Sequence, residues 1–155
     1  MESMHDHVVA TIARTRFPFP GQPHWPKDYV TRTNVPSRSR SIEVEGREHF
    51  PDIVIEDGTG RIREIGEIET ELDEASVPYL RAGSNIADDD TGAKVRHFFL
   101  YVPAGLESEG QALLDRHGIS YAGVRGYSVD DDGLVTVVPF VTPGDEYDHQ
   151  PTQKA

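Results

Sequence analysis

"HFPDIVIEDGTGRIREIGEIET", residues 49–70, carries the clearest strand signal in this chain of 155 residues. Ile53, Val54 and Ile55 are three β-branched residues in a row, and they predict a strand over residues 51–56. The composition of residues 57–60, Asp-Gly-Thr-Gly, is typical of a hairpin turn, so residues 61–70 are expected to form the paired strand. A hairpin requires neither a Pro-Asp at its head nor acidic residues at its tail. The placement of the Pro-Asp and of the acidic residues therefore indicates a functional site.

The carboxylates of this hairpin are expected to meet at its open end. Glu67 and Glu69 are two residues apart on one strand, so both point to the same face. The turn brings Asp52 near residues 67–70, although the sequence leaves the register open. Carboxylates that lie close together repel and raise one another's pKa, and a bound hard cation relieves that repulsion. Oxygen ligands favour Mg²⁺, Mn²⁺ or Ca²⁺ over Zn²⁺.

Outside the hairpin, the pattern predicts alternating helices and short strands. Val8, Val9, Ile12 and Ala13 form an apolar stripe, which predicts a helix over residues 4–16. A second helix begins after Ser76, and the apolar run over residues 95–102 is typical of a strand buried on both faces. The other predicted elements are strands at 28–32, 42–45 and 119–124, a helix at 106–117, and a hairpin of residues 126–129 and 134–140. This order predicts an α/β fold in which helices flank a mixed sheet.

Length and composition predict one domain over residues 1–142 and a flexible polar tail over residues 143–155. The chain has no cysteine, which excludes disulfides, thiol catalysis and thiolate metal sites. No apolar stretch reaches the roughly 20 residues of a membrane-spanning helix, and the first residues do not resemble a signal peptide. We therefore expect a cytoplasmic protein with no membrane partner. Taken over the whole chain, the net charge of −12 opposes binding to phosphate backbones.

Asp52 after Pro51, followed by Glu67-Ile68-Glu69, resembles the motif of the PD-(D/E)XK nuclease superfamily. Members have the core order α-β-β-β-α-β, with the Asp at the start of the second core strand and an acid-x-Lys triplet at the end of the third. The elements predicted from residue 4 to about residue 102 follow this order. The segment from Gly66 to Thr70, followed by residues 99–103, is also similar to uncharacterised microbial proteins placed in this superfamily. The resemblance implies a restriction-endonuclease-like fold, here extended by a C-terminal helix and β-hairpin that complete the sheet or form a homodimer face.

The same resemblance implies which residues form the site. Asp52 and Glu67 are implied to bind Mg²⁺ or Mn²⁺, together with the backbone carbonyl of Ile68, and the substrate is implied to be nucleic acid, DNA rather than RNA. Glu69 stands where the superfamily usually has Lys, and the change removes a positive charge from the site. Glu69 is implied to bind the metal or to accept a proton from water. The positive charge that the usual lysine supplies could then come from Arg81, Lys94 or Arg96.

Several residues have both a functional and a structural interpretation. Glu67 and Glu69 could instead be solvated strand residues opposite Arg61 or Arg63. Four arginines near the site could contact phosphates or simply belong to a solvated loop; they are Arg32, Arg38, Arg40 and Arg47. His5 and His7 are expected on the surface, Asp6 is expected to stabilise a helix N-terminus, and His49-Phe50 could stack on bases or pack in the fold.

Two functions and one structural alternative remain open from the sequence. The first is a metal-dependent nuclease, with Asp52, Glu67 and Glu69 as catalytic residues. The second is a nuclease fold that no longer cuts and binds a nucleic acid or a protein partner, an alternative that Glu69 and the acidic net charge favour. The third is a small interaction domain whose acidic residues solvate the edge of a sheet.

Overall fold

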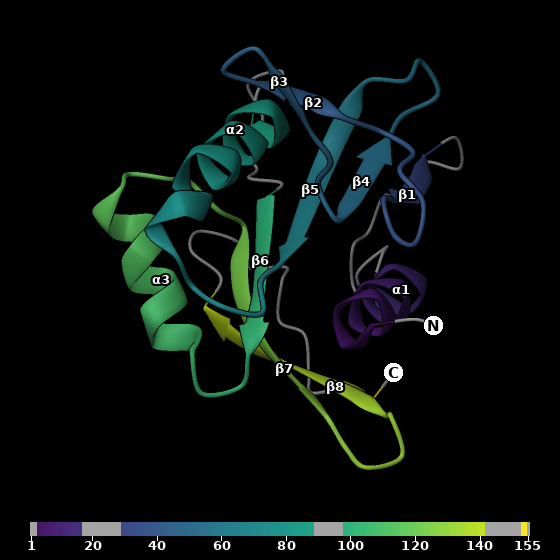
Figure 1. Cartoon of the computed structure of the whole chain (residues 1–155), viewed down its shortest axis with the longest axis vertical. Helices are drawn as coiled ribbons and strands as arrows, with labels where there is room; N and C mark the ends of the chain where they lie inside the picture. The colour runs from purple at the N-terminus through teal and green to yellow at the C-terminus, as the bar shows by residue number, and fades with distance from the viewer. Residues whose placement is uncertain (1–2, 17–28, 89–97, 142–152, 155) are drawn as a thin grey trace.

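The computed structural model describes residues 3–16, 29–88, 98–141 and 153–154 (Figure 1). Three α-helices and a short 3₁₀ helix are described: α1 (Met4–Arg16), η1 (Glu74–Ser76), α2 (Val77–Asp88) and α3 (Glu107–Arg116). The described strands are β1 (Val30–Thr33), β2 (Ile42–Val44), β3 (Arg47–His49), β4 (Ile53–Glu56), β5 (Ile62–Ile68), β6 (Phe98–Pro103), β7 (Gly123–Val129), β8 (Val135–Val141) and β9 (Gln153–Lys154). The fold is α/β, as the sequence predicts.

Within the described residues, the main sheet has the strand order β1-β4-β5-β6-β7-β8-β9, and β2 pairs separately with β3. The pairs β1–β4 and β4–β5 are antiparallel, β5–β6 and β6–β7 are parallel, and β7–β8 is antiparallel. The sheet is therefore mixed. Helix α2 connects β5 to β6 and α3 connects β6 to β7, the kind of crossover that parallel neighbours require.

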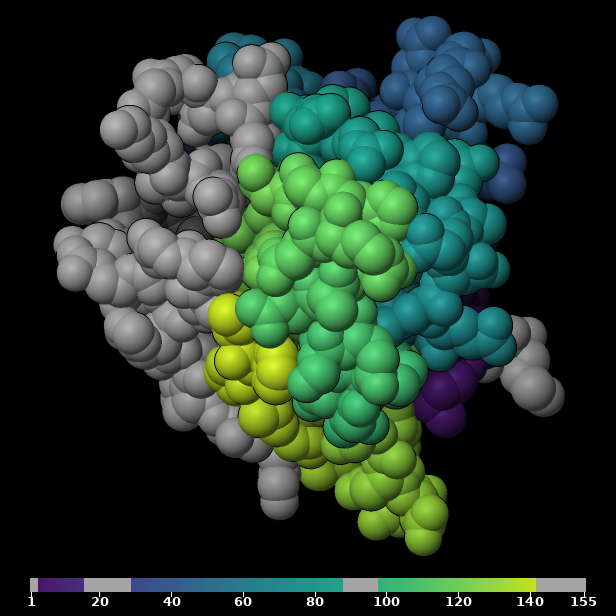
Figure 2. Space-filling view, turned by 90° about the vertical axis from the view of Figure 1, so that its left-hand side faces the viewer, coloured from purple at the N-terminus to yellow at the C-terminus, as the bar shows by residue number. Residues whose placement is uncertain are grey.

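Helices cover both faces of this sheet (Figure 1). Val8, Val9 and Ile12 of α1 are fully buried against one face, beside Ile53 and Tyr101. Residues of α2 and α3 pack on the opposite face, and Figure 2 shows these two helices side by side on the molecular surface. Burial on both faces explains why β6 reads as an almost continuous apolar run.

The β4–β5 hairpin forms as the sequence predicts. Asp57 organises its turn, because its carboxylate accepts hydrogen bonds from the backbone N–H groups of Thr59 and Arg61. Gly60 has a φ of 85°, a conformation that glycine adopts without strain. The register pairs Ile53 with Gly66, which places Asp52 beside Glu67 at the open end of the hairpin.

The helices agree closely with the sequence prediction, whereas the strands agree less well. The predicted strand at 119–124 is wrong over its first four residues, since β7 is one strand that begins at Gly123. The chain first wraps around the end of α3, where Gly118 has a φ of 65° and the Ile119 N–H bonds to the Leu114 carbonyl at 2.9 Å. That arrangement satisfies a helix-end carbonyl and prevents an extended backbone.

No separate strand is predicted at the position of β3, and β1 begins two residues later than predicted. Residues 17–28 and 89–97 fall outside the described residues, as does most of the predicted tail. Two residues of that tail, Gln153 and Lys154, form β9 beside β8. Among the described helices, none combines the length and apolar character needed to cross a membrane.

Candidate metal and nuclease site

Asp52 and Glu67 are each anchored by the backbone of the other's strand. The Asp52 N–H donates to Glu67 Oε1 at 2.9 Å, and the Ile68 N–H donates to Asp52 Oδ2 at 2.8 Å. The antiparallel register produces this exchange, because residue 52 comes opposite residue 67 where β4 begins. The two carboxylates predicted to converge therefore lie together at the hairpin's open end.

Glu67 is buried rather than solvated. Its side chain is only 3% exposed, which excludes the solvated-strand reading for this residue. Burial raises the pKa of Glu67 to about 7, the negative charge of Asp52 adds to this effect, and a hydrogen bond from His49 opposes it. A buried carboxylate of this kind is costly unless a cation or a donor compensates its charge.

Each of the two carboxylates has a histidine partner. His49 Nε2 lies 2.7 Å from Glu67 Oε2. His5 Nε2 lies 3.2 Å from Asp52 Oδ1 and 3.0 Å from the Ile68 carbonyl oxygen. The hydrogen bond to Asp52 raises the pKa of His5 to about 9, despite its partial burial. Burial lowers the pKa of His49, but the hydrogen bond and charge of Glu67 outweigh this and the net direction is upward.

The expectation of surface positions for His5 and His7 is wrong. His5 is half-buried in the site, and His7 Nε2 bonds to the Gly133 carbonyl oxygen at 2.7 Å, which ties α1 to the β7–β8 turn. One signal in the sequence indicated the position of His5. It precedes the buried Val8 and Val9 by three and four residues, so it shares their side of the helix. Asp6 contacts His5 Nδ1 through Oδ1 at 3.3 Å.

Glu69 extends the acidic cluster beyond the end of β5. Its N–H donates to the Tyr101 carbonyl at 2.9 Å, and its carbonyl oxygen accepts from the Tyr127 hydroxyl at 3.3 Å. Burial and the charge of Asp52 raise the pKa of the Glu69 carboxyl. Burial also raises the pKa of the Tyr127 phenol, with contributions from Glu69 and Asp52. No local pattern in the sequence predicts Tyr127 here, because β7 is two strands away from β5.

The donor set fits a hard divalent cation in part. Asp52 Oδ1 and the Ile68 carbonyl oxygen converge on a single position, which the His5 nitrogen occupies. Glu67 is fixed beside them through the Asp52 N–H, and each carboxylate oxygen retains a second lone pair. Across the described segments, however, no group of three or more His, Asp or Glu side chains is arranged to hold a metal ion. The fit therefore depends on two carboxylates and a backbone oxygen, which is the predicted ligand set.

The predicted phosphate-binding arginines have different environments. Arg32 and Arg40 both lie beside the buried carboxylate of Glu56, with nitrogen–oxygen distances of 2.7 and 3.1 Å. Arg38 is exposed, and its guanidinium carbon lies 4.7 Å from the centre of the Phe50 ring. Arg47 is exposed on β3.

The predicted substitutes for the missing lysine do not join the site within the described residues. Arg81 donates to the His117 carbonyl at 2.9 Å, at the end of α3. Lys94 and Arg96 lie outside the described residues.

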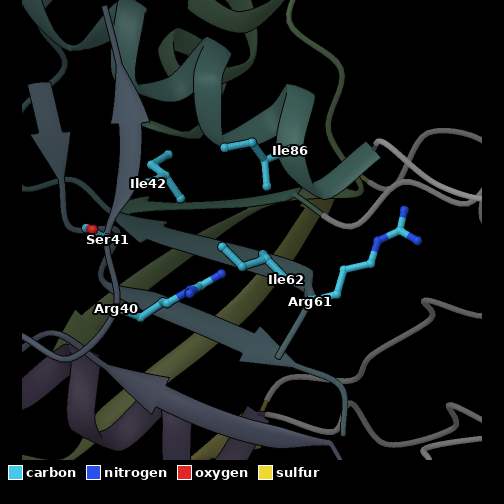
Figure 3. A pocket seen from close by; sticks show the side chains of 6 residues that line it. All are labelled: Arg40, Ser41, Ile42, Arg61, Ile62 and Ile86. Carbon is cyan, nitrogen blue, oxygen red and sulfur yellow. The ribbon is translucent and has the colours of Figure 1, made fainter. Parts of the chain in front are cut away.

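A separate pocket of about 300 Å³ lies near the other end of β5 (Figure 3). Ile42 of β2 and Ile86 of α2 face each other above Ile62, while Arg61 extends away from them. Arg40 also lines this pocket, but its guanidinium is engaged by Glu56 and by the Gly60 carbonyl. The pocket shares no lining residue with the carboxylate cluster.

Comparison of the chain with protein-family models, with curated proteins and with solved structures finds no match in any of the three. The assignment of function therefore depends on the residues described above.

Proposed function

We propose that this chain is a metal-dependent nuclease of the PD-(D/E)XK type, which hydrolyses phosphodiester bonds in nucleic acid. The mutual anchoring of Asp52 and Glu67 beside the Ile68 carbonyl supports this proposal most strongly. The order α1, β1, β4, β5, α2, β6 also agrees with the core order of the superfamily, with β2 and β3 as an insertion. A restriction-endonuclease-like core is part of the same proposal.

In this proposal Asp52, Glu67 and the Ile68 carbonyl hold Mg²⁺ or Mn²⁺. Such an ion supplies a Lewis acid that polarises the phosphoryl group and lowers the pKa of water. Glu69 accepts the proton of the attacking water, a role that suits a carboxyl group whose pKa is raised by burial. The water oxygen bonds to phosphorus, the bond from phosphorus to the leaving sugar oxygen breaks, and solvent protonates that oxygen.

His49 and His5 act on the ligands rather than on the substrate. His49 holds Glu67 in one orientation through its 2.7 Å hydrogen bond. His5, whose pKa is raised by its hydrogen bond to Asp52, supplies positive charge beside Asp52 and the Ile68 carbonyl when no ion is bound, and its imidazole must leave that position for the ion to bind there. Partners of this kind commonly change metal affinity or activity by about 10- to 100-fold.

The experiment is a cleavage assay on single- and double-stranded DNA and RNA with Mg²⁺, Mn²⁺ or EDTA. We expect EDTA to abolish cleavage, and Asp52→Asn and Glu67→Gln to reduce it by more than about 100-fold. Glu43→Gln, an exposed carboxylate on β2, is the matched control and should cleave at the wild-type rate. Cleavage that persists in both site variants would contradict the proposal.

The second candidate is a nuclease fold that binds nucleic acid or a protein partner without cutting. Glu69 favours it, because a negative charge replaces the lysine that stabilises the transition state. For this candidate we expect no cleavage, while millimolar Mn²⁺ raises the melting temperature of the wild type but not of Asp52→Asn.

A further inference from the structure

An aromatic surface begins at the proposed metal site and reaches solvent. His49, which bonds to Glu67, also packs against Tyr79 of α2, with ring centroids 4.7 Å apart and planes tilted by 32°. Tyr79 remains 36% exposed. One face of its ring is thus supported by His49, and the residue is two contacts away from a proposed metal ligand.

A second aromatic residue lies close to Asp52 in the sequence, and an arginine packs over its ring. Phe50 follows His49 and precedes Asp52 by two residues, and the guanidinium of Arg38 lies over its ring. Arg38 is exposed, so its charge is accessible to a phosphate or to the face of a base. Aromatic rings interleaved with arginine are the usual means by which proteins bind unpaired nucleotides.

The negative net charge of the chain disfavours binding of a nucleic-acid duplex at this site. The chain has a net charge of −12, and Arg32 and Arg40 are both paired with Glu56. A duplex presents phosphates on both strands and needs several cations to neutralise them. Stacking on a ring requires no positive charge, so it can provide affinity where electrostatic attraction is poor.

We propose that this site takes single-stranded nucleic acid, with an unpaired base stacked on Tyr79 and a neighbouring phosphate or base contacted by Arg38. The inference rests on the proposed function, since it names the substrate class of the same site. Because few phosphates are contacted, the affinity depends only weakly on salt.

The test measures binding by fluorescence anisotropy in Ca²⁺ or EDTA, which separates binding from cleavage. The ligands are a labelled 12-nucleotide oligo-dT, an oligo-rU of the same length, a 12-base-pair duplex, and an abasic strand with the same phosphates but no bases. We expect the single strands to bind at least about 10-fold more tightly than the duplex and the abasic strand, since each stacked base contributes substantially to affinity. The dT and rU arms distinguish DNA from RNA.

Four variants separate stacking from packing and from electrostatic attraction. Tyr79→Phe retains the ring and should bind like the wild type, whereas Tyr79→Leu covers His49 but cannot stack and should lose about 10-fold or more. Phe140→Ala removes another exposed aromatic side chain, three strands away from β5, and should have no effect. Arg38→Gln should weaken binding less than Tyr79→Leu does, and it should make the affinity depend less on salt concentration.

Equal binding of the abasic strand, tighter binding of the duplex, or wild-type binding by Tyr79→Leu would each overturn the inference. The two proposals fail in different ways. Cleavage that requires Asp52 but is faster on duplex and unaffected by Tyr79→Leu leaves the nuclease proposal standing and refutes the single-strand inference. Single-strand binding through Tyr79 without cleavage supports the non-cutting alternative and retains the stacking surface.

Discussion

Two histidine–glutamate pairs in this molecule have nearly the same geometry and opposite consequences. His49 Nε2 lies 2.7 Å from Glu67, and His117 Nε2 lies 2.8 Å from Glu74. The Glu67 side chain is 3% exposed, however, whereas that of Glu74 is 60% exposed. Burial raises the pKa of Glu67 to about 7, while hydrogen bonds from Arg116 and His117 lower the pKa of Glu74.

The difference shows that the environment, and not the contact, determines what a histidine–carboxylate pair does. At the surface, water and counterions solvate the charges, and such a pair contributes little to stability. In the buried pair, the charge of Glu67 remains costly, so a further cation placed beside it would be stabilising. A functional site can therefore contain the same histidine–carboxylate contact that contributes little where it lies on the surface.

Removing each histidine is the strongest way to test this comparison. His49→Ala leaves buried Glu67 Oε2 without its donor, and we expect a loss of about 3 kcal/mol, or roughly 10 °C in melting temperature. His117→Ala should leave the melting temperature unchanged within error, because its partner is solvated. Urea unfolding of both variants in EDTA provides the measurement.

The His49 variants also have a readout in metal binding. By titration calorimetry with Mn²⁺, we expect His49→Ala to bind about 10- to 100-fold more weakly, and His49→Gln, which keeps a side-chain N–H donor, to recover most of the affinity. Equal Mn²⁺ affinity in His49→Ala and the wild type would show that His49 does not position Glu67.

Replacing each glutamate should change stability in opposite directions. The pKa of Glu67 is higher in the folded state than in the unfolded state, so stability falls as the pH rises from about 4.5 through 7. Glu67→Gln removes this cost, and in EDTA at pH 8 we expect it to raise the unfolding free energy by roughly 1 to 3 kcal/mol. Glu74→Gln should lower the melting temperature or leave it unchanged, because the fold favours the ionised form of Glu74.

A wild-type or lower stability of Glu67→Gln at pH 8 would show that Glu67 is already compensated without metal. The same variant should lose the proposed activity. Higher stability together with lost function is the expected behaviour of a site that keeps a costly charge for a ligand.

The sequence predicted the parts of the site that depend on local geometry. Asp52 and Glu67 are joined by one tight hairpin, and the alternation of a strand places Glu67 and Glu69 on one side. The buried stripe of α1 was predicted for the same reason, because helical periodicity is a local property. Only the register was open, and the pairing of Ile53 with Gly66 determines it.

The histidine and tyrosine partners could not be predicted in the same way. His5 reaches the Ile68 carbonyl across 63 residues of chain, and Tyr127 reaches the Glu69 carbonyl across 58. These contacts depend on how α1 docks on the sheet and on the position of β7 in the strand order. Both are set by packing between distant segments, and no short sequence pattern encodes them.

The smallest predicted effect concerns the other histidine of the site. The pKa of His5 is raised from 6.5 to about 9, chiefly by its hydrogen bond to Asp52, so its contribution to stability is complete below pH 6.5 and is lost as the pH rises through 9. Because the side chain is 30% exposed, solvent screening reduces the contribution to about 1 kcal/mol. In EDTA, His5→Gln should therefore be less stable than the wild type at pH 6 and equal to it at pH 10. In the Asp52→Asn background the same substitution should cost little at either pH, whereas a cost independent of pH would show that His5 acts only as a neutral hydrogen-bond donor.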